Sequence, residues 1–226
     1  MKKVSPGKPE KMKLLVYGDP GAGKTYFAST FPNPVFIDLE GGLTGAAQEV
    51  LAVNERYPED VEELFETIFQ AEEYLEENPG TLVVDSFQEI INLVEQDIFS
   101  SYDHKRAYEG VLNQGDYRKL FVDTMKIVRH LLNGNYNLVI TGIALPASYQ
   151  GEKRYPKFTG RMLGPEIFRL MNNIAYCYSD SAGDNWVSFV DTESWLAKTR
   201  FAELRKELEW SNNLKEIPPC AYLFDS

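Results

Sequence analysis

The stretch that decides the fold is Gly18-Asp19-Pro20-Gly21-Ala22-Gly23-Lys24-Thr25, which directly follows the apolar run Leu14-Leu15-Val16-Tyr17. It matches the pattern G-x-x-x-x-G-K-[ST], and its position predicts a buried strand before it and a helix from Lys24. Glycines in such a loop let successive backbone N–H groups converge on a phosphate, and the start of the helix adds positive potential. The motif therefore predicts a nucleoside triphosphate site formed by residues 18–25, with Tyr26 beside it.

Two residues of the motif and one distant carboxylate carry the predicted phosphate chemistry. Lys24 is expected to reach the β- and γ-phosphate oxygens, and the Thr25 hydroxyl is expected to ligate Mg²⁺. Asp85 ends the apolar run at residues 82–84, where a second carboxylate is needed to orient a magnesium-bound water. It could instead share with Ser86 the capping of the next helix. The expected cofactors are ATP and Mg²⁺, although no base-reading motif separates ATP from GTP.

Glu40 is the candidate general base. It lies two residues after Asp38, which ends a second apolar run at residues 34–38. If that strand neighbours the phosphate-loop strand, its carboxyl end opens on the γ-phosphate, and a carboxylate there can polarise the attacking water. Asp38 competes for the role, and Glu40 could equally be a polar loop residue before Gly41-Gly42.

Apolar strands alternate with helical patterns along most of the chain. The alternation predicts an α/β fold with a mainly parallel sheet, helices on both faces and an antiparallel hairpin at one edge. A flexible basic tail is expected at residues 1–12, an ATPase core at 13–204, and a C-terminal tail at 205–226 that packs on the core or at an interface. The expected strands are 14–17, 34–38, 81–85, 138–141, 174–179 and 186–191, and the main expected helices are 59–77, 90–98, 116–132 and 165–171.

The order of these elements resembles the RecA/RadA-type P-loop ATPase core, and within it the small RecA-like single-strand annealing and recombination proteins of bacteriophages. The resemblance covers residues 14–200. Its marks are the phosphate loop, Phe36-Ile37-Asp38-Leu39-Glu40-Gly41-Gly42, Leu82-Val83-Val84-Asp85-Ser86, the strand at 138–141 and Ala197-Lys198-Thr199-Arg200. It implies a DNA-stimulated, Mg²⁺-dependent ATPase with Glu40 as the catalytic glutamate.

The resemblance also implies self-assembly into a ring or filament. Lys198 and Arg200 match paired basic residues that reach the nucleotide of a neighbouring subunit and neutralise charge on the transferred phosphoryl group. Without the family, they would be alternating solvent-facing charges at a strand end. The family's sensor position, usually glutamine, falls on Thr141, whose shorter side chain departs from the pattern.

Two loops combine cations with aromatic rings, as proteins that grip single-stranded nucleic acid do. By resemblance they are residues 100–115 and 145–161, and they make single-stranded DNA the expected partner, with a single-strand binding protein as a further candidate. Such mixtures also occur on neutral loops and at protein interfaces. The candidate DNA contacts are Lys105, Arg106, Lys153, Arg154, Lys157 and Arg161.

The net charge of −11 at first argues against a nucleic-acid partner. However, residues 59–77 hold nine acidic and no basic residues, so the rest of the chain carries only −2. The expected location is the cytoplasm, with no membrane partner, because no long apolar segment occurs and two cysteines are too few for a disulfide framework. Two rival interpretations are a P-loop kinase of small, nucleotide-type molecules and a nucleotide-switched adaptor for replication or packaging proteins.

Overall fold

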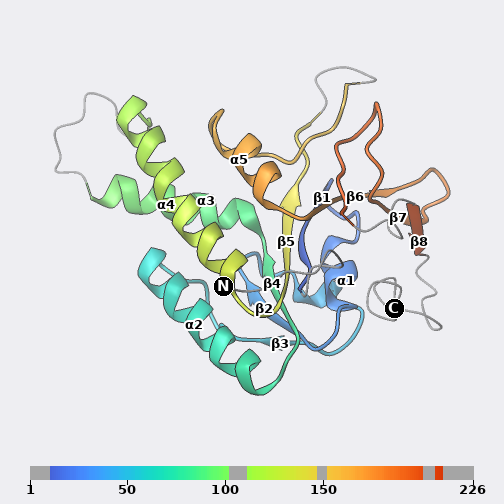
Figure 1. Cartoon of the computed structure of the whole chain (residues 1–226), viewed down its shortest axis with the longest axis horizontal. Coiled ribbons are helices and arrows are strands. Elements are labelled where there is room, and N and C mark those ends of the chain that lie inside the picture. The colour runs from blue at the N-terminus through green and yellow to red at the C-terminus, as the bar shows by residue number, and fades with distance from the viewer. Residues whose placement is uncertain (1–10, 102–110, 147–151, 201–206, 211–226) are drawn as a thin grey trace, which may run out of the picture.

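The structure is a computed structural model that describes residues 11–101, 111–146, 152–200 and 207–210. Within these residues an eight-stranded sheet has the order β3-β2-β4-β5-β1-β6-β7-β8 (Figure 1). The strands from β3 to β6 are parallel, and β7 and β8 extend the edge in antiparallel fashion. The strands are β1 (Lys13–Gly18), β2 (Pro34–Asp38), β3 (Leu51–Ala52), β4 (Thr81–Asp85), β5 (Asn137–Ile143), β6 (Asn173–Ser179), β7 (Asn185–Ser188) and β8 (Glu207–Trp210).

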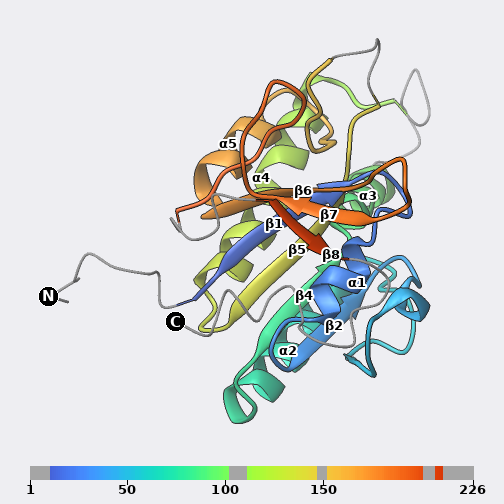
Figure 2. The same ribbon diagram turned by 90° about the vertical axis from the view of Figure 1, so that its right-hand side faces the viewer.

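The central strands are buried on both faces, which is why the sequence shows them as continuous apolar runs rather than alternating patterns. β1 lies between β5 and β6, and β5 separates β1 from β4 (Figure 2). Gly18 pairs with Ile143, and Asp38 pairs with Asp85. The carboxyl ends of β1, β2, β4 and β5 therefore open on one edge of the sheet.

Two layers of helices cover the sheet. The apolar faces of α2 (Val61–Glu77), α3 (Phe87–Ser100), α4 (Gln114–Asn133) and α5 (Leu163–Leu170) belong to one large core cluster on one face. On the other face, α1 (Lys24–Ser29) packs with strand residues in a second, smaller cluster. A short 3₁₀ helix, η1 (Leu43–Gly45), follows β2.

Local signals explain the helix boundaries. Asp60 caps α2 by accepting a hydrogen bond from the Glu63 N–H at 2.9 Å. Asn113 and Asp116 form a reciprocal capping box at the start of α4. These positions set the starts of both helices within two residues of the expected ones.

The expected fold class is confirmed: the sheet is mainly parallel, helices cover both faces, and β6 and β7 form the antiparallel hairpin. β7 is shorter than expected, because it ends at Ser188 rather than at residue 191. Two strands were not predicted. β3 has only two residues, and β8 lies in the weakly patterned C-terminal segment, where pairing with β7 makes it part of the sheet.

Candidate nucleotide site

The phosphate loop connects β1 to α1 through glycines in backbone conformations that other residues rarely adopt. Gly21 and Gly23 both have φ of 79°, in the left-handed region, and Gly23 is the N-cap of α1. Pro20 and Gly21 are exposed, whereas Ala22 is buried in the smaller core cluster. One side of the loop is thus fixed to the core while the other faces solvent.

Lys24 lies over its own loop. Its ammonium group donates hydrogen bonds to the backbone carbonyls of Gly18 at 3.3 Å and Asp19 at 3.0 Å. The Ala22 N–H also donates to the Asp19 carbonyl, at 3.2 Å. Tyr26 is half-buried and packs against the smaller core cluster. The cation expected to bind phosphate is therefore held at the first residues of the loop.

Asp85 is joined to two hydroxyl groups. Its Oδ2 accepts a hydrogen bond from Thr25 Oγ1 at 2.6 Å, and its Oδ1 accepts one from Thr141 Oγ1. Asp85 is only 2% exposed and Thr141 is fully buried. Asp85 does not cap α3: Ser86 occupies the N-cap position, and its hydroxyl makes no capping bond.

A hydroxyl and a carboxylate in contact at the end of a phosphate loop suit Mg²⁺, which prefers oxygen ligands and keeps waters and phosphate oxygens as further ligands. Thr25 and Asp85 are the residues that would hold the ion. No group of three or more His, Cys, Asp and Glu side chains able to hold a metal occurs in the described ranges. A magnesium ion shared with a nucleotide does not need such a group.

Glu40 lies next to this centre. Its Oε1 accepts a hydrogen bond from Ser86 Oγ, and the N–H of the preceding Leu39 donates to the Asp85 carbonyl at 2.6 Å. Asp38 holds the turn, because its Oδ1 accepts hydrogen bonds from the backbone N–H groups of residues 40, 41 and 42. Asp38 is therefore engaged with the backbone, and Glu40 is the exposed carboxylate of the pair.

The reason given for Glu40 from the sequence needs correction. β2 does not neighbour the phosphate-loop strand; it pairs with β3 and β4, and both β4 and β5 separate it from β1. Glu40 comes close to the loop by another route. β2 ends beside Asp85, and the turn after it brings Gly42 close to Thr25, where a Cβ on the glycine would lie 4.0 Å from the Thr25 hydroxyl oxygen.

Tyr57 lies near two acidic side chains, one of which is Glu40. The pKa of the Tyr57 hydroxyl is raised by burial, and then by the carboxylates of Glu89 and Glu40. Glu89 lies in the first turn of α3, and Tyr57 precedes α2. The carboxylates of Glu40 and Glu89 thus lie near one tyrosine hydroxyl beside the carboxyl end of β2.

A family model described as an AAA domain matches residues 10–201. The chain belongs to the AAA domain family. The match includes the phosphate loop, Glu40, Asp85 and Arg200, and it identifies an ATPase-type P-loop core. A search of curated proteins finds no match.

Lys198 and Arg200 of this AAA domain lie on a segment that follows β7. Lys198 forms an antiparallel bridge with Ile174, and its ammonium donates to the carbonyls of Phe168 and Met171, both at 2.8 Å, at the end of α5. Burial, and then the charge of Arg200, lowers the pKa of Lys198. Within its own chain Lys198 caps α5, whereas Arg200 is exposed.

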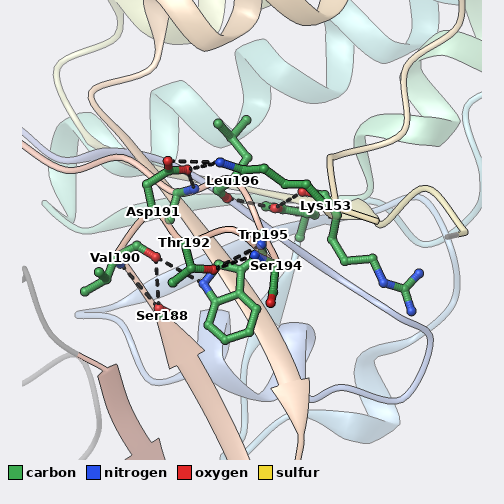
Figure 3. A network of polar contacts seen from close by, with 11 residues as sticks. Lys153, Ser188, Val190, Asp191, Thr192, Ser194, Trp195 and Leu196 are labelled. Atoms are coloured by element: carbon green, nitrogen blue, oxygen red, sulfur yellow. Dashed lines mark hydrogen bonds and ion pairs between the residues drawn. The ribbon is translucent and has the colours of Figure 1, made fainter. Parts of the chain in front are cut away.

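The four described residues that are expected to contact DNA have different surroundings. Lys153 forms a two-pronged ion pair with Asp191, with both oxygens at 2.9 Å (Figure 3). Arg154 contacts Asp19 of the phosphate loop. Lys157 is exposed, and Arg161 is exposed at an apolar groove lined by Tyr117 and other residues of α4. Lys105 and Arg106 lie outside the described residues.

Three site residues were not assigned from the sequence: Thr141 as a partner of Asp85, Ser86 as a partner of Glu40, and Arg154 at the phosphate loop. Thr141 is a polar residue at the end of an apolar run on a central strand, and this pattern indicates a buried hydroxyl that needs a hydrogen-bond partner. The position of Ser86 directly before a helix indicates a cap and gives no sign of its contact with Glu40. Nothing in the local sequence connects Arg154 with Asp19, because 135 positions separate them.

Among the described residues, no helix is long and apolar enough to cross a membrane.

Proposed function

We propose that this AAA domain binds ATP with Mg²⁺, hydrolyses it, and uses the cycle to act on single-stranded DNA in phage recombination or annealing. The observation that carries the proposal is the arrangement at the ends of β1, β2 and β4. Thr25 donates to Asp85, while the adjacent Ser86 donates to Glu40. A metal-binding pair and a carboxylate suited to activate water thus lie side by side.

The reaction is the in-line attack of water on the γ-phosphate. Lys24 binds the β- and γ-phosphate oxygens and neutralises the charge that develops on them. Bound Mg²⁺ supplies charge neutralisation at the phosphate oxygens. Ser86 fixes Glu40 through Oε1, and Oε2 then accepts a hydrogen bond from the attacking water and takes its proton.

Assembly and DNA complete the proposal. Arg200, the exposed residue of the basic pair, reaches the nucleotide of a neighbouring subunit in a ring or filament, while Lys198 anchors the same segment to the end of α5, so that hydrolysis depends on assembly. The exposed cations Lys157 and Arg161 contact the DNA backbone, together with Lys105 and Arg106. A single-strand binding protein is a candidate partner on the same DNA.

The test measures ATPase rate and nucleotide affinity with and without single-stranded DNA, at low and high salt, with particle size recorded for each sample. Lys24→Ala should abolish both binding and hydrolysis. Glu40→Gln should lower kcat by about 10²- to 10⁴-fold while leaving nucleotide affinity nearly unchanged. Glu73→Gln, on the exposed face of α2, is the matched control and should leave the ATPase rate unchanged.

Each part of the proposal has its own contradicting outcome. ATPase rates that are indifferent to DNA at both salt concentrations rule out the DNA part. Full acceptor-dependent phosphoryl transfer by Glu40→Gln identifies a kinase instead. No triphosphate binding by the unaltered chain rules out the whole proposal.

A further inference from the structure

Arg154 was expected on a DNA-binding loop, but its guanidinium lies at the phosphate loop. Nη2 is 3.4 Å from Asp19 Oδ2, and Nη1 donates to the Leu145 carbonyl at 3.1 Å. The two side chains remain partly accessible, with 29% of Arg154 and 50% of Asp19 exposed. A cation and a carboxylate thus meet at the second residue of the motif, on the solvent side of the loop.

The chain path explains this position. After β5, the Ala144 N–H donates to the Gly18 carbonyl at 3.1 Å, so the chain continues alongside the start of the phosphate loop. The returning segment pairs with it, since Ala144 and Pro156 form an antiparallel bridge and Leu145 N–H donates to the Tyr155 carbonyl. Arg154 is therefore carried back beside the strand that neighbours β1.

The backbone of Arg154 is fixed on both sides. Its N–H donates to the Ser194 carbonyl at 2.8 Å, and its carbonyl accepts from the Leu196 N–H at 3.0 Å. The hydroxyl of the buried Tyr17, on β1, lies 2.7 Å from the Leu196 carbonyl and 3.1 Å from the Arg154 carbonyl, so its single proton is shared between the two oxygens. The guanidinium therefore extends from a rigid platform attached to the strand that leads into the phosphate loop.

The neighbouring cation, Lys153, does not share the position of Arg154 at the phosphate loop. Successive residues of an extended segment point in opposite directions. The ammonium of Lys153 reaches Asp191, whose Oδ1 also accepts from the Ala197 N–H (Figure 3). Of the two adjacent cations, one is neutralised away from the nucleotide site and the other is directed to it.

We propose that Arg154 binds the terminal phosphate of a nucleoside triphosphate in the site of its own chain, and that Asp19 holds it in position beforehand. Lys24 donates to the Asp19 carbonyl while Arg154 contacts the Asp19 carboxylate, so the two cations converge on one residue. Lys24 serves the β- and γ-phosphates, which places the guanidinium at the γ end. A guanidinium has five donors, so it can bind a phosphate oxygen while it keeps the carboxylate.

The inference rests on the proposed nucleotide binding and adds a residue that distinguishes a triphosphate from a diphosphate. It also gives Asp19 a purpose. A lone carboxylate in a phosphate loop repels the ligand, whereas one paired with arginine orients a cation toward it.

The test is calorimetric titration with Mg²⁺ and either an ATP analogue with a nitrogen bridge between the β- and γ-phosphates, or ADP. Arg154→Gln should weaken analogue binding about 10- to 100-fold, as expected for a lost charge-assisted contact, and ADP binding less than about threefold. Lys153→Gln removes the adjacent charge and should change neither affinity. Thermal unfolding without nucleotide checks that both variants fold.

The double variant Asp19→Asn with Arg154→Gln separates binding from neutralisation. If Arg154 touches the phosphate, the double variant regains only the part of the affinity that the unpaired Asp19 carboxylate removed, and it still binds the analogue more weakly than the unaltered chain. Full recovery of affinity in the double variant would mean that Arg154 only neutralises Asp19, and would overturn the inference. Equal weakening of both nucleotides, or of neither, overturns it too, as does weakened binding of single-stranded DNA with unchanged analogue affinity. If the unaltered chain binds no analogue, the proposed function and the inference fall together.

Discussion

Replacing Thr141 by valine tests the hydrogen bond that holds Asp85. Valine keeps the branched shape of threonine but removes the hydroxyl, so Oδ1 of a carboxylate that is 2% exposed loses its donor. A hydrogen bond to a charged group contributes about 1.5 to 3 kcal/mol, so we expect a loss of about 2 kcal/mol in the free energy of unfolding. For a domain of this size, that corresponds to a decrease in Tm of about 4 to 8 °C.

The helix layer on the other face of the sheet offers a matched control. Thr124 on α4 is also fully buried, and its hydroxyl has no hydrogen-bond partner among the described residues. Thr124→Val should therefore be neutral within about 0.5 kcal/mol, or slightly stabilising. Thr141→Ser keeps the hydroxyl and loses one methyl group, which should cost about 1 kcal/mol.

The assay is urea unfolding followed by tryptophan fluorescence at pH 7, with the three variants beside the unaltered protein. The expected order of destabilisation is Thr141→Val, then Thr141→Ser, then Thr124→Val. If Thr141→Val and Thr124→Val unfold at the same urea concentration, the Thr141 hydroxyl contributes nothing and the account of how Asp85 is fixed is wrong.

Two further predictions concern the start and end of β1. A Cβ on Gly18 would lie 2.2 Å from the Cys177 carbonyl oxygen, so Gly18→Ala must separate β1 from β6 and should lower the free energy of unfolding by about 3 kcal/mol or more. Gly42→Ala is the control: its Cβ would lie 4.0 Å from the Thr25 hydroxyl oxygen, and it should change the free energy of unfolding in urea by no more than about 0.5 kcal/mol. Similar losses in the two variants would contradict the register of β1 against β6. Burial lowers the pKa of Lys13 from 10.5 to about 8, so the unfolded chain binds more protons between these values and the free energy of unfolding should rise with pH there. Urea unfolding from pH 7.5 to 9.5 should show this rise relative to Lys13→Met, and parallel pH profiles would refute it.

Much of the fold was predictable because its signals are local. β2 and β4 have the expected limits, since each is a short apolar run between turn residues or charges. The contact between Thr25 and Asp85 follows from the same kind of signal. Carboxyl ends of parallel strands open at the same edge, so residues in that position converge whatever the details of the connections.

The other contacts of the site depend on the order of the strands in the sheet and on the segment that folds back after β5. Neither feature produces a periodic pattern in the sequence. The position of β5 between β4 and β1 brings Thr141 to Asp85 and moves β2 away from the phosphate-loop strand. The cations and aromatic rings around Arg154 in the sequence favour a DNA-binding loop. The bridge between Arg154 and Trp195, which sets its actual position, has no signal in the local sequence. β8 forms by pairing with β7, and its own sequence carries little signal.

The two unequal core clusters have a consequence for how ligand binding affects the whole molecule. Among the described α-helices, α1 alone contributes buried residues to the smaller cluster, through Phe27 and Ala28. Ala22 of the phosphate loop belongs to the same cluster, and Phe27 makes an edge-to-face contact with Phe31. The element that begins at the phosphate loop is thus also the cover of one face of the sheet. Local opening of that face must dismantle the nucleotide site, so ligand binding raises the free energy of opening for every amide beneath α1. Hydrogen exchange in the strands under α1 therefore reports occupancy of the loop, even at residues that never touch the ligand.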